Sequence, residues 1–187
     1  MIYVALLRGI NVGGNNKIEM KKLKSTFESL GFNHVVTYIN SGNIIFETIE
    51  EPIEHIEKRI EQAITKDFSL NIRVLLRSFE NIKTICQELP DSWVKNQIMR
   101  TDVLFLWEEF DNPESIDQLK ISSVDNVKYI SGAVLWNVEE KDYSKSGMQK
   151  LVGTKIYKNM TVRNVNTVRK LYQMMTDIDD KLKTSTV

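Results

Sequence analysis

Cysteine, histidine and proline are scarce in this 187-residue chain, and charge of neither sign prevails. The single cysteine, Cys86, excludes an intramolecular disulfide and a multi-cysteine zinc site. Twenty-five basic residues balance twenty-five acidic ones, which argues against binding of nucleic acid by bulk electrostatics but leaves room for a local basic patch.

Long hydrophobic runs are also lacking. The N-terminal apolar run reaches Arg8 after seven residues, so it is too short for a membrane span, and it lacks the basic start of a signal peptide. We therefore expect a cytoplasmic protein with no membrane partner. Apolar residues make up 42% of the chain and charged residues 27%, which is typical of a globular protein large enough to bury a core.

The first half of the chain predicts the order β-α-β-β-α-β, which is typical of a ferredoxin-like unit. Apolar runs predict strands, and apolar residues at helical spacing predict helices that end at glycine or begin at proline. The expected strands are 2–8, 35–40, 43–47 and 72–76, and the expected helices are 20–30 and 53–64.

The second half repeats this order less regularly. A connecting helix is expected over 79–89, strands over 102–107, 127–130, 134–138 and 155–158, and helices from 113, over 144–152 and from 165. The segment after Asp177 has no apolar period and predicts a frayed tail. The expected domains are an N-terminal half, 1–77, a C-terminal half, 78–176, and a flexible tail, 177–187.

The two expected hairpins resemble each other. Ser41-Gly42 and Ser131-Gly132 each form the turn, 90 residues apart, and an apolar run ending in an aromatic residue follows each. This repeat predicts duplication. The fold class is therefore α+β, with two ferredoxin-like halves, antiparallel sheets and helices on one face of each sheet. Because the strands are apolar on both sides, we expect the second face to be buried by the other half or by a partner chain.

The segment Gly9–Lys17 between the first strand and the first helix is rich in glycine and asparagine. Gly9, Gly13 and Gly14 permit left-handed backbone angles and close approach of a ligand, Asn11 adds an amide, and Arg8 and Lys17 add positive charge. The phosphate-binding P-loop motif fails because Asn15 stands where lysine is needed, and the Rossmann glycine spacing is absent. Anion binding and a purely conformational need for glycine therefore remain two readings of this segment.

The first hairpin is expected beside this segment. A ferredoxin-like unit has strand order 4-1-3-2, so the third strand starts near the end of the first, and Asn43 should lie near Arg8. Tyr38, Ser41 and Asn43 then become candidate ligand contacts. The alternative is that serine and asparagine serve only the tight turn.

A third polar group precedes the last helix. Thr161 or Asn164 can cap that helix, and Arg163 offers a planar guanidinium to a carboxylate or phosphate. His34, His55 and Cys86 lack partners at metal-ligand or catalytic spacing, so the sequence predicts no metal site, names no cofactor and leaves open whether the protein is an enzyme.

Three sequence blocks carry a resemblance to a known family. The blocks YVALLRGINVGGNNKIEM, TYINSGNIIFE and TVRNVNTVRKL resemble the bacterial family called domain of unknown function 1697, over essentially the whole chain. The resemblance implies an α+β fold of two ferredoxin-like parts and no known activity. Members of the family often have tryptophan where Val165 follows the Arg-Asn pair. The three blocks coincide with the three polar segments, which favours one shared site.

The leading functional hypothesis is a cytoplasmic protein, monomeric or weakly dimeric, that binds a phosphate-bearing small molecule. The lining residues would be Arg8, Gly9, Asn11, Gly13, Gly14, Lys17, Tyr38, Ser41, Asn43, Arg163 and Asn164. An RNA-binding module is the alternative, because Ile2-Tyr3-Val4 resembles the first strand of an RNA-recognition fold. It is disfavoured by the zero net charge and by the lack of paired aromatic residues in the third strand. A structural or interaction role is the remaining alternative.

Overall fold

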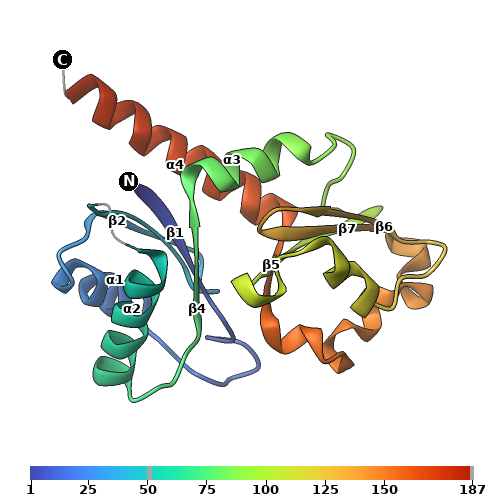
Figure 1. The fold of residues 1–187 in the computed structure, drawn as a ribbon, viewed down its shortest axis with the longest axis horizontal. Helices are drawn as coiled ribbons and strands as arrows, with labels where there is room; N and C mark the ends of the chain where they lie inside the picture. The colour runs from blue at the N-terminus through green and yellow to red at the C-terminus, as the bar shows by residue number, and fades with distance from the viewer. Residues whose placement is uncertain (50–51, 186–187) are drawn as a thin grey trace. The chain divides into compact units, whose positions relative to one another are not determined.

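The computed structural model describes residues 1–49 and 52–185 and consists of two units. The first unit comprises Met1–Phe79 together with the segment from Leu171 onward, and the second comprises Glu80–Lys170. Each unit contains one four-stranded sheet, and each is described by itself (Figure 1).

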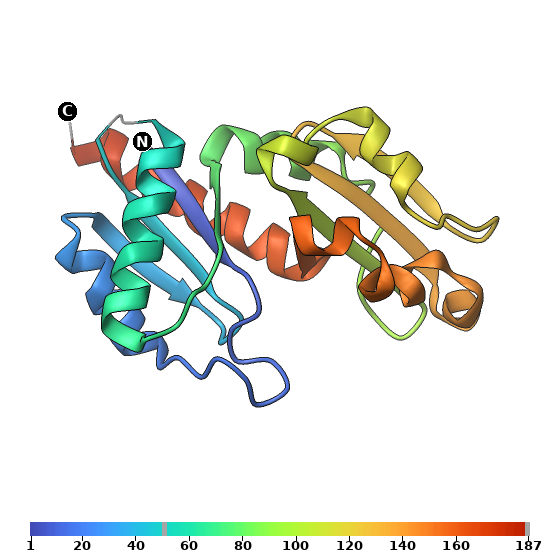
Figure 2. The same cartoon turned by 60° about the horizontal axis from the view of Figure 1, so that its bottom comes forward.

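The first unit has the β-α-β-β-α-β order that the sequence predicts. Its strands are antiparallel in the order β2-β3-β1-β4, and α1 and α2 cover one face of the sheet (Figures 1 and 2). The elements are β1 (Ile2–Leu7), α1 (Met20–Ser29), β2 (Asn33–Tyr38), β3 (Asn43–Glu47), α2 (Ile53–Phe68) and β4 (Val74–Ser78), followed by α3 (Phe79–Glu88).

The core of the first unit follows from the two periodicities of its elements. Alternate residues of a strand share one face, which places Tyr3, Ala5 and Leu7 of β1 in the core under the helices. The isoleucines of α2 recur every fourth residue and fill the same core from the helix side. The buried isoleucines are Ile56, Ile60 and Ile64.

The second unit has a sheet of the same topology, β6-β7-β5-β8, again antiparallel. Short 3₁₀ helices replace the α-helices between its strands. The elements are β5 (Met99–Leu106), η1 (Glu108–Phe110), η2 (Pro113–Gln118), β6 (Asn126–Ile130), β7 (Ala133–Glu139), η3 (Glu140–Lys145), η4 (Gly147–Gly153), η5 (Ile156–Asn159) and β8 (Met160–Asn164); α4 (Val165–Ser185) follows.

Two sequence predictions in the second unit are wrong. The helix expected over 144–152 is split into η3 and η4, because Ser146 between them has an extended backbone. The strand expected over 155–158 is η5, and the edge strand β8 begins only at Met160. The sequence also predicted a frayed segment after Asp177, whereas α4 continues to Ser185, with Lys183 and Asp179 paired one turn apart.

The two units repeat each other in their hydrogen bonds, which confirms duplication. The N–H of Leu7 donates to the carbonyl of Gly42 at 2.8 Å, and the N–H of Leu106 donates to that of Gly132 at 3.1 Å. The residue that follows each of these donors also corresponds. The N–H of Arg8 donates to the carbonyl of Arg73, and the N–H of Trp107 donates to the carbonyl of Asn159. The loop after β1 therefore corresponds to the loop after β5.

Both faces of the central strands are buried, as their two-sided apolar character predicts. Val4 and Leu6 of β1 and Val103 and Phe105 of β5 have no exposed surface. No helix within the described part of the chain is long and apolar enough to cross a membrane.

Candidate functional site

The glycine loop, Gly9–Lys17, is a small hairpin that projects from the end of β1 (Figure 2). The N–H of Asn15 donates to the carbonyl of Val12 at 3.0 Å, and the two residues between them, Gly13 and Gly14, have φ angles of 58° and 81°. Positive φ at both central residues defines a type I′ turn. The Gly13-Gly14 pair is thus explained by the shape of this turn.

Space around the loop glycines is open. A Cβ atom added at Gly9, Gly13 or Gly14 would meet no atom within 4 Å. The backbone at these three positions is therefore accessible from outside. Gly42 differs, since an added Cβ would stand 2.7 Å from the Cβ of Leu7, so glycine there permits close packing of the β2–β3 turn on β1.

Asn11 attaches the glycine loop to the β2–β3 turn. Its Nδ2 donates to the carbonyls of Ile18 and Asn40 at 3.0 and 2.9 Å, and its Oδ1 accepts from the N–H of Ile18 at 2.8 Å. The amide thus uses both ends of its side chain inside the protein. Its observed role is to hold the loop in place.

Tyr38, Ser41 and Asn43 lie at the same end of the sheet, as the strand order predicted. The buried Nδ2 of Asn43 donates to the carbonyl of Tyr38 at 3.1 Å and to the Ser41 Oγ at 3.0 Å. These bonds fix the β2–β3 turn. Within the first unit, the structure therefore brings all nine of its predicted site residues to one end of β1.

Arg8 has a basic neighbour at this end of β1, Arg73, which the sequence analysis did not assign to the site. The N–H of Arg8 donates to the carbonyl of Arg73 at 3.0 Å and extends the register that pairs Leu7 with Val74. The two arginines therefore lie opposite each other on neighbouring strands. Asn16 Nδ2 donates to the Gly9 carbonyl at 3.0 Å, and the exposed Lys17 follows Asn16. Pairing the first strand with the fourth by register would have found Arg73.

The N-terminus of α1 adds little to this end of the sheet. The glycine loop reaches α1 only through Ile18 and Glu19, and Glu19, which precedes the first turn, forms no capping hydrogen bond through its side chain. An acidic residue at this position competes with any anion for the free N–H groups of the helix. Positive charge at this end of the sheet therefore comes from the arginines and the lysine.

Arg163 and Asn164 lie in the second unit. Arg163 is only 8% exposed, and its guanidinium donates to the Thr161 Oγ1 and to the carbonyl of Val162, each at 2.9 Å. Burial lowers its pKa to about 10. Asn164 accepts the N–H of Thr167 at 2.9 Å and so caps α4, which confirms one of the two capping residues expected. That either residue joins the glycine loop in one site stays a prediction.

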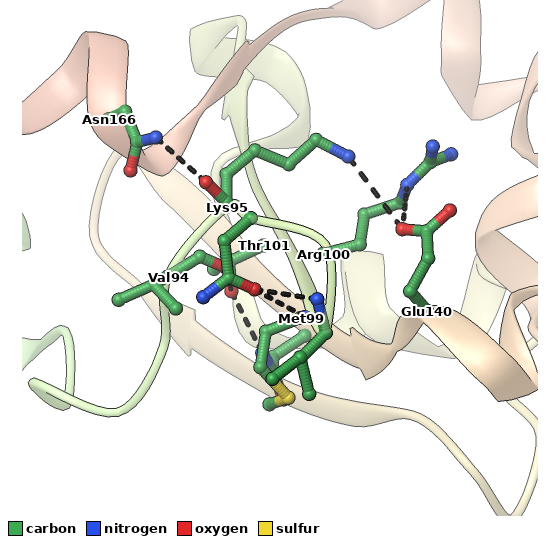
Figure 3. Close-up of polar contacts among 10 residues, drawn as sticks. Val94, Lys95, Met99, Arg100, Thr101, Glu140 and Asn166 are labelled. Carbon is green, nitrogen blue, oxygen red and sulfur yellow. Dashed lines mark hydrogen bonds and ion pairs between the residues drawn. The ribbon is translucent and has the colours of Figure 1, made fainter.

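A second polar cluster attaches the loop before β5 to the sheet of the second unit (Figure 3). The carboxylate of Glu140 accepts from the Arg100 Nε at 3.2 Å and lies 3.9 Å from the Lys95 Nζ. The Asn166 amide donates to the Lys95 carbonyl, and the Thr101 hydroxyl donates to that of Val94, each at 2.9 Å. These bonds hold the loop against the sheet, so a structural role explains why the polar residues are clustered.

Metal-binding groups are not assembled in the described residues. Among residues 1–49 and 52–185, no three His, Cys, Asp or Glu side chains are grouped so as to hold a metal ion. Burial raises the pKa of the Cys86 thiol to about 11, so the reactive thiolate is scarce at neutral pH.

These features define a duplicated ferredoxin-like α+β protein with a cationic, glycine-rich loop at the end of its first strand. The family described as "Protein of unknown function (DUF1697)" matches residues 1–136, and the chain belongs to that family. The closing block, 161–171, lies outside the matched residues, although the resemblance was expected to include it.

Comparison with known proteins supports the fold but gives no activity. No protein with a curated description matches the sequence. Among solved structures, the conserved bacterial protein SP0830 from Streptococcus pneumoniae is 29% identical, with a TM-score of 0.80. The match covers 93% of this chain and 98% of that chain, so the two-unit architecture is shared along nearly the whole length.

Proposed function

We propose that this protein binds an anionic, phosphate-bearing small molecule at the end of β1 in its first unit. The observation that carries the proposal is the charge of the three segments that meet there. Residues 8–17, 38–43 and 71–73 contain the cations Arg8, Lys17 and Arg73 and no aspartate or glutamate. In a chain with zero net charge, the basic composition of these three segments is a distinct local excess.

The position of Arg8 opposite Arg73 supports the proposal. Two planar guanidinium groups on neighbouring chain segments suit the oxygens of a phosphate in a bidentate manner. Lys17, on the exposed loop, adds a flexible third charge.

The open glycines and exposed amides complete the surface. Gly9, Gly13 and Gly14 leave their backbone accessible, and Asn15 and Asn16 are exposed beside them. Backbone N–H groups and amides supply neutral donors to phosphate oxygens that the cations do not reach. The three segments contain no histidine, cysteine or carboxylate, so binding without catalysis is the function proposed.

One observation disfavours RNA binding. In an RNA-recognition fold, the aromatic residues of the central strands stack bases on an open sheet face. Here Tyr3 is 1% exposed and packs in the core under the helices, with its ring 6.1 Å from that of Phe46. No base can stack on it in this conformation.

Thermal unfolding tests the proposal. Inorganic phosphate, sulfate or a nucleotide, added at constant ionic strength against chloride, should raise the melting temperature by mass action on the folded state. At a concentration about 100 times the dissociation constant, the stabilisation is about 2.7 kcal/mol, or roughly 5–10 °C for a chain of this length.

The variants Arg8→Ala and Arg73→Ala should each remove most of this shift while the ligand-free protein stays folded. Lys66→Ala, which removes an exposed cation on α2, is the matched control and should keep the full shift. If no phosphate-bearing ligand raises the melting temperature, or if all three variants retain the shift equally, the proposed site is wrong and a structural role is favoured.

A further inference from the structure

The open edge of the first sheet has its outward N–H groups occupied by side chains. Among the strands that the structure describes, β4 pairs only with β1, so it is an edge strand and every second N–H of β4 points away from the sheet. Because Arg8 and Arg73 form a hydrogen-bonded pair, the alternation directs the N–H groups of Val74 and Leu76 outward.

Two glutamates of α2 accept these outward N–H groups. Glu61 Oε1 accepts from Val74 at 2.9 Å, and Glu57 Oε1 accepts from Leu76 at 2.8 Å. Four helical residues rise about 6 Å and two strand residues about 6.6 Å, so the spacings match. The earlier glutamate bonds the later strand residue, as expected where helix and strand run antiparallel. We call these two bonds the edge contact.

The two glutamates flank the buried isoleucine stripe of α2, which holds the helix on the sheet. Figures 1 and 2 show α2 on the face of the sheet that β4 borders. The edge contact thus connects the helix that covers the core to the strand at the sheet's border. If α2 moves away from β4, the outward N–H groups become available for pairing with a further strand.

Glu57 is the member of the edge contact whose charge is most affected by its surroundings. Desolvation by burial raises its pKa from 4.5 to about 7, against the lowering effects of the Leu76 N–H and of Arg77 on β4. The other charged groups that act on it are Glu61 and Glu54 of α2, and both raise its pKa further. Among the described residues, Arg77 is thus the one cation that offsets burial and two like charges.

We propose that Glu57 makes the closure of the β4 edge dependent on protons near neutral pH. The protonated carboxyl is accommodated in the closed edge contact, whereas the ionised carboxylate favours an opened state in which it is hydrated. Closure is therefore strongest at mildly acidic pH and weakens as the pH rises through neutrality. This inference concerns a different part of the first unit from the proposed anion site and does not depend on it.

The sign follows from linkage. The pKa of Glu57 is higher in the closed state than in the opened or unfolded state, so its contribution to closure is complete below about pH 4.5 and is lost as the pH rises to about 7. With these two pKa values, the equilibrium constant for opening rises up to about tenfold between pH 6 and pH 8.

Amide hydrogen exchange of the full chain tests the proposal. After division by the intrinsic exchange rate, the protection of the Leu76 N–H should fall up to about tenfold from pH 6 to pH 8 in the wild type. In Glu57→Gln, which keeps an acceptor oxygen but cannot ionise, this dependence should disappear. Glu61→Gln is the matched control: it alters the other bond of the edge contact but leaves Glu57 in place, and the dependence should remain.

An NMR titration of the Glu57 side-chain carboxyl carbon in the wild type does not depend on any variant folding. A midpoint near 7 supports the proposal, and a midpoint near 4.5 overturns it. Protection of Leu76 that is independent of pH in the wild type, or a dependence equal in Glu57→Gln and wild type, also overturns it.

Discussion

At the residue scale, the glycines of the loop after β1 are required for backbone angle rather than for space. Gly14 has a φ of 81°, in the region that side chains with a Cβ rarely adopt, and it has no close neighbour. A substitution at this position therefore reports the cost of the backbone conformation alone.

Gly14→Val should lower the free energy of unfolding by about 1–3 kcal/mol, because valine is β-branched and resists positive φ. Equilibrium urea denaturation measures this loss. Gly153→Val is the control: that glycine also has open space but not a left-handed φ, and the change should be below about 0.5 kcal/mol. Equal losses in both variants would contradict the assignment of cost to backbone angle.

Much of the candidate site could be predicted at this scale, and the reason is topological. The strand order of a ferredoxin-like unit was sufficient to place Ser41 and Asn43 near Arg8. Arg73 was missed because its role depends on register across the first and fourth strands, and register needs the exact start of β4. The internal hydrogen bonds of Asn11 were also beyond prediction, since they depend on the path of an irregular loop.

At the element scale, the second unit shows how one carboxylate can organise segments without regular helices. Asp125 accepts the N–H and hydroxyl of Ser122 at 2.8 and 2.9 Å, the N–H of Gly147 at 2.9 Å, and the hydroxyl of Ser146. A Cβ at Gly147 would stand 1.5 Å from the Lys120 carbonyl oxygen, so only glycine fits there. Asp125 thereby connects the segment before β6 to η4.

Asp125→Asn should destabilise the protein most near neutral pH. Desolvation raises the pKa of Asp125, but hydrogen bonds, above all that from Ser146, outweigh it and hold the pKa below 3.8. The stabilisation by the carboxylate is therefore present above about pH 4 and is lost as the pH falls through the folded-state pKa. We expect wild type and variant to differ by about 1–3 kcal/mol at pH 7.

Urea denaturation at pH 7 and near pH 3 measures this difference, provided that both proteins remain folded at the lower pH. The gap between wild type and Asp125→Asn should narrow on acidification. A gap that stays constant would show that the carboxylate's charge is not the source of the stabilisation.

The 3₁₀ helices around Asp125 explain why element prediction failed in this region. Apolar spacing over 144–152 is compatible with a helix, but helical periodicity does not reveal that Ser146 must extend so that its hydroxyl reaches Asp125. Side-chain hydrogen bonds to a distant residue override local propensity, and a distant partner is not visible in a local pattern. The regular α1 and α2, which depend on apolar stripes alone, were predicted well.

At the scale of the whole molecule, duplication was visible in the sequence through only two Ser-Gly turns. The structure extends the correspondence to the hydrogen bonds at the ends of β1 and β5. An arginine near the end of each edge strand also corresponds: the half-buried Arg77 lies opposite Val4, and the buried Arg163 lies opposite Val103. Each of these arginines donates to the carbonyl of the residue before it, at 2.9 Å in both units.

The last helix, α4, gives a prediction at the scale of the whole molecule. Leu171 and Met175 have no exposed surface, and the segment from Leu171 onward belongs to the first unit. Met175→Ala should therefore cost about 2–5 kcal/mol, mainly through a cavity in the first unit. Hydrogen exchange should show loss of protection in β1 and β3 before β5 and β7. Loss confined to the second unit would contradict this.

The discontinuity of the first unit also affects how the chain folds while it is being made. Residue 171 is synthesised 92 residues after Phe79, which closes the first part of that unit. At typical translation rates of about 5–20 residues per second, the nascent first unit waits roughly 5–20 s for its last segment. During that time the second unit, which is continuous, is completed, so the part of the protein that begins first is finished last. Slow translation or a pause in this interval would lengthen the exposure of unfinished apolar surface to chaperones and proteases.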